Sequence, residues 1–241
     1  MGNVRRSLAG ATAAALAALV MTGCGQRPHY ASDGTPLPAA YKEVGQLPER
    51  LAADGTTIVV GDPAAPTTVR LYEDPRCPIV EEFEATGAPA LHGMTLRRET
   101  RTEYVLASFR DDRVGGDGSK RAVNALRAAL EAGKFTEYRA VVFAHMRENE
   151  DAGGFSTENL LNLAIQVPGL RSATFDSAVS TMKYADFVTA SQERYERAGG
   201  DDPLGPGTPA VAVNGTWIQG AQRDLIFGRT SFGRLLSQVN S

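Results

Sequence analysis

The sequence predicts an α/β fold in which a central mixed sheet is interrupted by a helical insertion. Three observations carry this prediction. Residues 57–61 and 67–72 are runs of β-branched and aromatic residues, residues 119–198 have helical spacing, and strand character returns at residues 208–213. The chain has 241 residues, 42% hydrophobic and 22% charged, which is an ordinary globular composition and enough length for one large domain.

The charge balance and the histidines exclude several classes of function. With 25 Lys and Arg against 28 Asp and Glu, the formal net charge is −3, which argues against nucleic acid as a partner. His92 and His145 lie far apart in the sequence, and neither has a Cys, Asp or Glu at ligand spacing. We therefore assign no metal site, and we expect no cofactor.

Residues 1–23 have the features of an export signal. A short basic stretch around Arg5 and Arg6 precedes an apolar run from Leu8 to Met21, which is too short to span a membrane. We therefore leave this segment out of the fold and expect the protein to be exported.

The end of this segment resembles a bacterial lipobox. It reads Val20-Met21-Thr22-Gly23-Cys24, and the resemblance implies that Cys24 receives a diacylglycerol thioether and becomes the new N-terminus. The protein would then be a lipoprotein on the outer face of the cytoplasmic membrane. An ordinary secretory peptide with an incidental cysteine is the alternative. Cleavage before Cys24 removes two arginines, so the net charge of the mature chain becomes −5.

Residues 24–55 are predicted to form a flexible tether. Pro28, Pro36, Pro38 and Pro48 interrupt them, and they show little apolar periodicity. If Cys24 carries lipid, Cys77 is the sole remaining thiol, and an intramolecular disulfide is impossible.

Two strands and a helix are predicted directly after the tether. The runs at residues 57–61 and 67–72 are bounded by the turn dipeptides Asp62-Pro63 and Asp74-Pro75. Cys77 is predicted to cap a helix, because the proline that follows it suits the first helical position and acidic residues come next.

A third strand is predicted at residues 102–109, before a glycine-rich break at residues 115–118. Apolar residues at helical spacing then fill residues 119–198, and the Gly199-Gly200 pair that follows is a typical helix end. These residues form the predicted insertion.

A hairpin and a closing helix complete the predicted domain, which covers residues 56–241. Asn214-Gly215 is a strong turn signal between the strand at residues 208–213 and the short arm at residues 216–218. The tail from Leu225 to Val239 has the apolar pattern of a helix.

Taken together, these features resemble the DsbA-like branch of the thioredoxin superfamily. The match consists of a strand ending in an acid-and-proline turn, Cys77-Pro78 at a helix start, a helical insertion, and Thr208-Pro209 before a strand and an Asn-Gly hairpin. It covers residues 56–239. The resemblance implies a thioredoxin-like sheet, a cis peptide bond at Pro209 that faces Cys77, and a substrate site formed by Thr208, Pro209 and Pro78.

The cysteine motif departs from the family pattern. The family has Cys-x-x-Cys, whereas this chain reads Cys77-Pro78-Ile79-Val80. The thiol that would resolve a mixed disulfide is therefore absent, and release of a bound substrate must wait for an external thiol.

The surroundings of Cys77 contain opposing electrostatic influences. The helix N-terminus and the neighbouring Arg76 favour a thiolate, whereas Glu73, Asp74, Glu81 and Glu82 disfavour a further negative charge. The sequence leaves open which influence dominates.

Two functions from different classes remain. The first is monothiol exchange, in which Cys77 forms mixed disulfides with exported proteins or low-molecular-weight thiols and an external thiol resolves them. This would make the protein a thiol-disulfide oxidoreductase or isomerase. The second is a non-catalytic lipoprotein that holds exported polypeptides or an envelope partner through the groove at Pro209. Accessibility of the sulfur discriminates between them.

Overall fold

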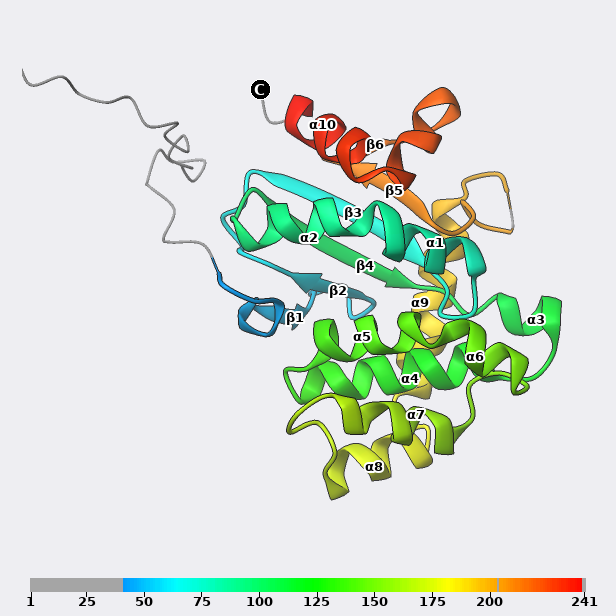
Figure 1. Ribbon diagram of the computed structural model, residues 1–241. Helices are drawn as coiled ribbons and strands as arrows, with labels where there is room; N and C mark the ends of the chain where they lie inside the picture. Colours follow the sequence, from blue (N-terminus) through cyan, green and yellow to red (C-terminus); the bar gives the residue numbers. More distant parts are fainter. Residues whose placement is uncertain (1–40, 203, 240–241) are drawn as a thin grey trace, which may run out of the picture.

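The computed structural model describes residues 41–202 and 204–239 (Figure 1). The predicted export signal, the lipidation site Cys24 and the first part of the predicted tether lie outside the described residues. None of the helices within the described ranges is long and apolar enough to cross a membrane.

Six strands form one mixed sheet in the order β1-β2-β4-β3-β5-β6. The two central strands, β3 and β4, are parallel, and every other neighbouring pair is antiparallel. The predicted α/β class with a central mixed sheet is confirmed. The strands are β1 (Glu49–Leu51), β2 (Thr57–Val60), β3 (Thr67–Glu73), β4 (Thr100–Leu106), β5 (Ala210–Val213) and β6 (Thr216–Trp217).

Helices connect the strands and form the insertion between β4 and β5. Short 3-10 segments are η1 (Val44–Gln46), η2 (Ala164–Gln166) and η3 (Gly220–Phe227). The α-helices are α1 (Pro78–Thr86), α2 (Ala88–Leu96), α3 (Arg110–Val114), α4 (Gly118–Glu131), α5 (Phe135–Ala144), α6 (Met146–Asp151), α7 (Thr157–Leu163), α8 (Ala173–Ser180), α9 (Ala185–Ala198) and α10 (Arg229–Val239).

The two faces of the sheet are covered differently. Inward residues of β3 such as Val69 and Leu71 belong to one large core with Phe83 of α1 and Phe232 of α10. On the opposite face, Tyr72 belongs to a smaller cluster with α9. Helices α4 to α8 form a layer beside α1, and α2 and α10 lie side by side over the sheet (Figure 1).

Residues 41–55 belong to the folded domain, which corrects the predicted extent of the tether. Strand β1 pairs with β2, with Arg50 opposite Val59. The carboxylate of Glu49 accepts hydrogen bonds from the backbone N–H groups of Phe135 and Thr136, at 2.9 and 2.7 Å, and thereby caps α5. Sequence reasoning missed this strand because it is only three residues long and two of the three, Glu49 and Arg50, are charged.

We expect Glu49→Ala to destabilise the protein by about 1–2 kcal/mol, the usual cost of losing a helix N-terminal cap. The loss leaves two donors at the start of α5 without their carboxylate. Urea unfolding measures the change, and Glu43→Ala, at an exposed position without a side-chain cap bond to η1, is the matched control. Equal stability of the two variants would contradict the capping role.

Other elements also differ from the sequence predictions. The third predicted strand covers Thr100–Leu106 in place of residues 102–109, and two helices, α2 and α3, have no counterpart in the sequence analysis. The predicted closing helix is divided into η3 and α10. Gly87, at the junction of α1 and α2, lies so close to η3 that a Cβ there would sit 1.7 Å from the carbonyl oxygen of Ile226. Such tertiary contacts leave little local signal.

Candidate functional site

Cys77 lies at the N-cap of α1, at the end of the turn that follows β3. Its backbone N–H donates to the carbonyl oxygen of Asp74 at 3.0 Å, and its own carbonyl oxygen accepts from Val80 N–H at 3.0 Å. Pro78 occupies the first helical position, as predicted. The sequence therefore holds the thiol at the positive end of a helix of nine residues.

The Thr208-Pro209 peptide bond is cis and lies directly beside this thiol. Strand β5 runs antiparallel to β3 with Ala210 opposite Tyr72, which brings the residues before β5 next to the turn after β3. The Cys77 thiol donates to the carbonyl oxygen of Thr208 at 3.4 Å. Two segments 131 positions apart thus meet at one point, as the resemblance implied.

The fourth position of the motif is a buried apolar residue. Val80 is fully buried and belongs to a cluster with Cys77 and with Phe143 of α5. Cys77 is a free cysteine and is itself 5% exposed, whereas Pro78 and Ile79 beside it are exposed. The thiol is therefore largely shielded, although the residues directly after it are exposed.

Arg76 does not leave a free positive charge beside the thiol. Its guanidinium donates to Asp111 of α3 at 2.9 Å and to Glu150 of α6 at 2.6 Å. Two carboxylates therefore balance its charge, and the expectation that it favours a thiolate finds no support in this geometry. The group instead joins the turn before Cys77 to the helical insertion.

Asp74 holds the same turn in place. Its carboxylate accepts hydrogen bonds from the backbone N–H of Arg76, from the Ser119 hydroxyl and from the backbone N–H of Arg110, at 2.9, 2.7 and 3.0 Å. Burial raises the pKa of Asp74 to about 6, although these hydrogen bonds act in the opposite direction. A titratable group with this pKa therefore lies three residues before the thiol.

The raised pKa of Asp74 predicts a specific pH dependence of stability. The folded state keeps the proton up to about pH 6, whereas the unfolded state releases it near pH 3.8. The unfolded state therefore binds fewer protons between these values, and stability falls by roughly 2–3 kcal/mol as the pH rises through this window. Asp74→Asn should remove this contribution.

The contribution of Asp74 to the free energy of unfolding is measured by urea unfolding of the wild type and of Asp74→Asn, at several pH values between 4 and 7.5. Acids that do not interact with Asp74 titrate equally in both proteins, so the difference between the two curves isolates Asp74 together with its effect on Glu73, whose pKa the charge of Asp74 raises. A difference that stays constant across this pH range would refute the prediction.

A second buried charge cluster lies beneath the site. Glu73, the last residue of β3, accepts from Arg139 of α5, whose Nε lies 2.7 Å from Glu73 Oε1. The same guanidinium donates to Glu84 of α1 at 2.9 Å. Burial raises the pKa of Glu73, and the charge of Arg139 opposes this effect. Sequence reasoning missed Arg139, although a charged residue among the apolar residues of α5 is a usable signal.

Tyr195 of α9 supports the loop that leads to Pro209. Its ring packs against Gly205, where a Cβ would lie 2.4 Å from the ring carbon Cε1. Its hydroxyl is buried and faces the backbone of Gly207, and the hydroxyl of Thr208 is buried as well. Burial raises the pKa of Tyr195 to about 12. The helical insertion therefore supports both sides of the site, the loop at Pro209 and the turn before Cys77.

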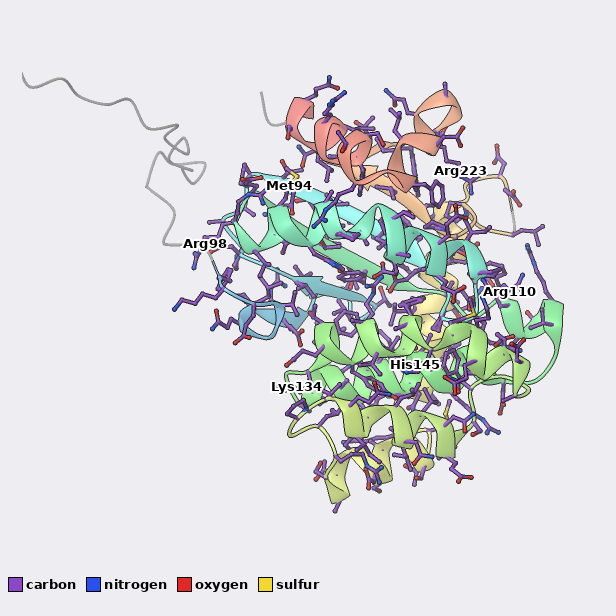
Figure 2. The ribbon with its side chains drawn as sticks, in the orientation of Figure 1. Met94, Arg98, Arg110, Lys134, His145 and Arg223 are labelled. Carbon is purple, nitrogen blue, oxygen red and sulfur yellow. The ribbon has the colours of Figure 1, made fainter. Side chains whose placement is uncertain are left out.

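A groove of about 450 Å³ starts at Pro209 and runs along the hairpin. Trp217 forms one wall of it and stacks on Tyr72, with ring centroids 5.2 Å apart. Arg223 lies at the same groove (Figure 2). Trp217 therefore serves both as packing and as a groove wall.

The predicted site residues fall into two groups. Cys77, Pro78, Thr208 and Pro209 come together at the start of α1, whereas Cys24 lies outside the described residues. In the part of the chain that the structure describes, no group of three or more His, Cys, Asp or Glu side chains is arranged to hold a metal ion.

Comparison with known proteins identifies similar sequences and folds. The family model described as thioredoxin matches residues 53–228. No curated protein matches the chain. The fold is similar to that of MdbA, a thiol-disulfide oxidoreductase from Actinomyces oris, with a TM-score of 0.64 and 18% identity over 82% of this chain and 91% of that chain.

Two further solved structures have a similar fold. BdbD from Bacillus subtilis gives a TM-score of 0.62 and 17% identity, over 83% of this chain and 98% of that chain. DsbA from Chlamydia trachomatis gives a TM-score of 0.58 and 19% identity, over 76% of this chain and 90% of that chain. These likenesses establish the fold.

Proposed function

The chain belongs to the thioredoxin family and has the fold of its DsbA-like members, and on this premise we propose that it is a monothiol exchange protein acting through Cys77. One observation carries the proposal: the thiol lies at a helix N-terminus and against the carbonyl oxygen of Thr208, which precedes cis-Pro209. Helix N-termini stabilise thiolates, and the thiolate is the reactive form in disulfide exchange.

The exchange proceeds in two displacements. The Cys77 thiolate attacks a substrate disulfide, a sulfur–sulfur bond forms between Cys77 and one half of the substrate, and the other half leaves as a thiolate. An external thiolate then attacks this mixed disulfide and releases Cys77. The pair of steps exchanges one thiol partner for another without net oxidation, so the direction of the reaction depends on the external thiol pool.

The absence of a thiol at position 80 supports this assignment of roles. Oxidation of a substrate dithiol by the protein itself needs a disulfide within the protein, and Val80 cannot contribute a sulfur. The reactions open to a single thiol are isomerisation of disulfides and their reduction by an external thiol. We therefore propose exported proteins and low-molecular-weight thiols as the two classes of partner.

The groove at Pro209 is proposed to hold the polypeptide substrate. An extended segment would pair with backbone groups at Thr208 and Pro209, as in strand addition, while its apolar side chains contact Trp217. Pro78 is exposed and would border the segment on the side of α1.

The membrane location is part of the same proposal. Residues 1–23 support export, and the lipobox-like sequence before Cys24 supports a diacylglycerol anchor on the outer face of the cytoplasmic membrane. Lipid attachment would consume the thiol of Cys24 and leave Cys77 as the only thiol.

A second candidate function is a non-catalytic lipoprotein that binds partners through the groove at Pro209. The low exposure of Cys77, 5%, favours this candidate, because a sealed sulfur does not exchange. The groove does not depend on the sulfur.

Trapping of mixed disulfides separates the two candidates. The probe is a cysteine-containing peptide whose thiol is joined by a disulfide to a small thiol. We expect each molecule of the reduced protein to form one mixed disulfide when it is mixed with this probe. Added external thiol should then clear it. Intact-mass measurement detects the adduct, and Cys77→Ser should form none.

A matched groove variant completes this experiment. Ala210→Arg, at a half-buried position in the groove, should slow adduct formation with the peptide but not with a small disulfide. If Cys77→Ser retains partner capture and Ala210→Arg abolishes it, the protein is a binding module and the exchange proposal fails.

A further inference from the structure

A second groove, of about 520 Å³, lies between α2 and α10. We call it the α2–α10 groove. Its apolar lining includes Ala90 and Met94 of α2, and the helices approach closely at Gly233, where a Cβ would lie 3.7 Å from that of Ala90. Figure 2 shows Met94 beside α10. Three arginines border the groove, namely Arg97, Arg229 and Arg234.

The charged residues that line this groove are all basic. Arg97 donates to Glu99 at 2.7 Å, so its charge is shared. Arg229 and Arg234 are exposed, and neither forms an ion pair with another of the described residues. Two unneutralised guanidinium groups therefore lie over an apolar floor, on a protein whose formal net charge is −3. An anionic and partly apolar partner fits this pattern.

The groove runs along α2 and α10 and reaches the end of the domain where the described chain begins. The backbone N–H of Tyr41 donates to the carbonyl oxygen of Leu96 at 2.8 Å, one residue before Arg97. In Figure 1 this end of α2 and the C-terminal end of α10 lie on the left of the view, as does the start of the described chain before η1. The start of α1, where Cys77 lies, is at the opposite end.

An anchor at Cys24 would keep the groove within reach of a membrane. The 17 residue-to-residue steps from Cys24 to Tyr41 can span at most about 60 Å when fully extended. The tethered domain therefore samples the bilayer surface at high effective concentration, and modest surface contacts are enough to orient it. Guanidinium groups bind phosphate oxygens through paired hydrogen bonds.

We propose that the α2–α10 groove docks on the anionic phosphate headgroups of the membrane. Docking through this groove turns the end that carries Cys77 and the groove at Pro209 toward the extracytoplasmic space. The inference rests on the membrane anchoring proposed above and is independent of the thiol chemistry.

An environment-sensitive fluorophore at Gln238, in the groove, tests this docking. The full lipidated chain carrying Cys77→Ser and Gln238→Cys is labelled and reconstituted in vesicles of phosphatidylcholine, with or without phosphatidylglycerol. A label at Lys120→Cys, an exposed position at the start of α4, is the matched control. We expect a blue shift at position 238 only in the anionic vesicles, and no shift at position 120.

Charge reversal then identifies the groups responsible. Each basic residue at an anionic surface contributes about fivefold to binding, so Arg229→Glu with Arg234→Glu should lower the ratio of docked to undocked protein at least ~25-fold. Reversal of Lys120 and Arg197, exposed elsewhere, changes the net charge equally and should have little effect. High salt should abolish the shift.

Three results would overturn the proposal. One is the same emission at position 238 in both kinds of vesicle, and another is a shift that survives the double reversal in the groove. The third is a shift that free glycerol 3-phosphate produces in neutral vesicles while anionic vesicles produce none, which would identify a soluble phosphate as the ligand. Loss of peptide exchange without loss of the shift would affect the proposed function alone.

Discussion

Replacing Val80 by cysteine is expected to release a bound substrate about 100-fold faster than the wild type when external thiol is held near 10 μM. The reason is proximity. Cys77 is the N-cap of α1 and Val80 is its third residue, and side chains at these two positions turn toward each other. The structure places both in one cluster. A thiol there acts at an effective concentration of about 1 mM or more.

The chemistry of this variant is balanced within the protein. The introduced thiolate attacks the Cys77 sulfur of the mixed disulfide, a disulfide forms between positions 77 and 80, and the substrate leaves as a thiolate. Compared with its dithiol form, the protein has lost two electrons. The substrate disulfide has gained them, and both of its sulfurs have become thiols. Stopped reactions analysed by intact mass measure both the rate of release and the new internal disulfide.

Val80→Ser is the matched control for this experiment. Serine has nearly the size of cysteine and disturbs the buried cluster similarly, but it has no sulfur. Its mixed disulfide should persist until external thiol is added, as in the wild type. If Val80→Cys releases substrate no faster than Val80→Ser, the assignment of position 80 as the missing resolving position is wrong.

The part of the candidate site around Cys77 and Pro209 could be predicted from the sequence because its signals are local. Cys77-Pro78 marks a helix start, and Thr208-Pro209 stands directly before a strand and an Asn-Gly turn. The pairing of β3 with β5 follows from the fold class that these signals indicate, and it brings Cys77 to the carbonyl oxygen of Thr208.

The supporting side of the site could not be predicted, because its contacts join distant segments. Arg76 reaches Asp111 and Glu150 in the insertion, and Tyr195 lies under the loop before Pro209. A helical period identifies α9 as a helix but does not say which part of the sheet it covers. The same limit hides the role of Glu49, which caps a helix 86 positions later.

Arg139→Met is expected to destabilise the protein by about 3–5 kcal/mol, the largest effect of any substitution considered. Arg139 is 2% exposed and binds two carboxylates, Glu73 of β3 and Glu84 of α1. Methionine fills much of the same volume but removes the charge, which leaves Glu73 buried without a counter-charge. Because Glu73 lies at the end of β3, four residues before Cys77, the loss also loosens the base of the site.

Two comparisons separate the buried charge from other effects of this substitution. Arg171→Met breaks an ion pair of similar geometry with Asp176, in which both side chains are about one third exposed, and should cost less than about 1 kcal/mol. Glu73→Gln combined with Arg139→Met removes the uncompensated charge and should recover a large part of the stability. Urea unfolding measures all the variants. If Arg139→Met is no more destabilising than Arg171→Met, or if the double variant is as unstable as the single one, a buried unpaired carboxylate is not the cause.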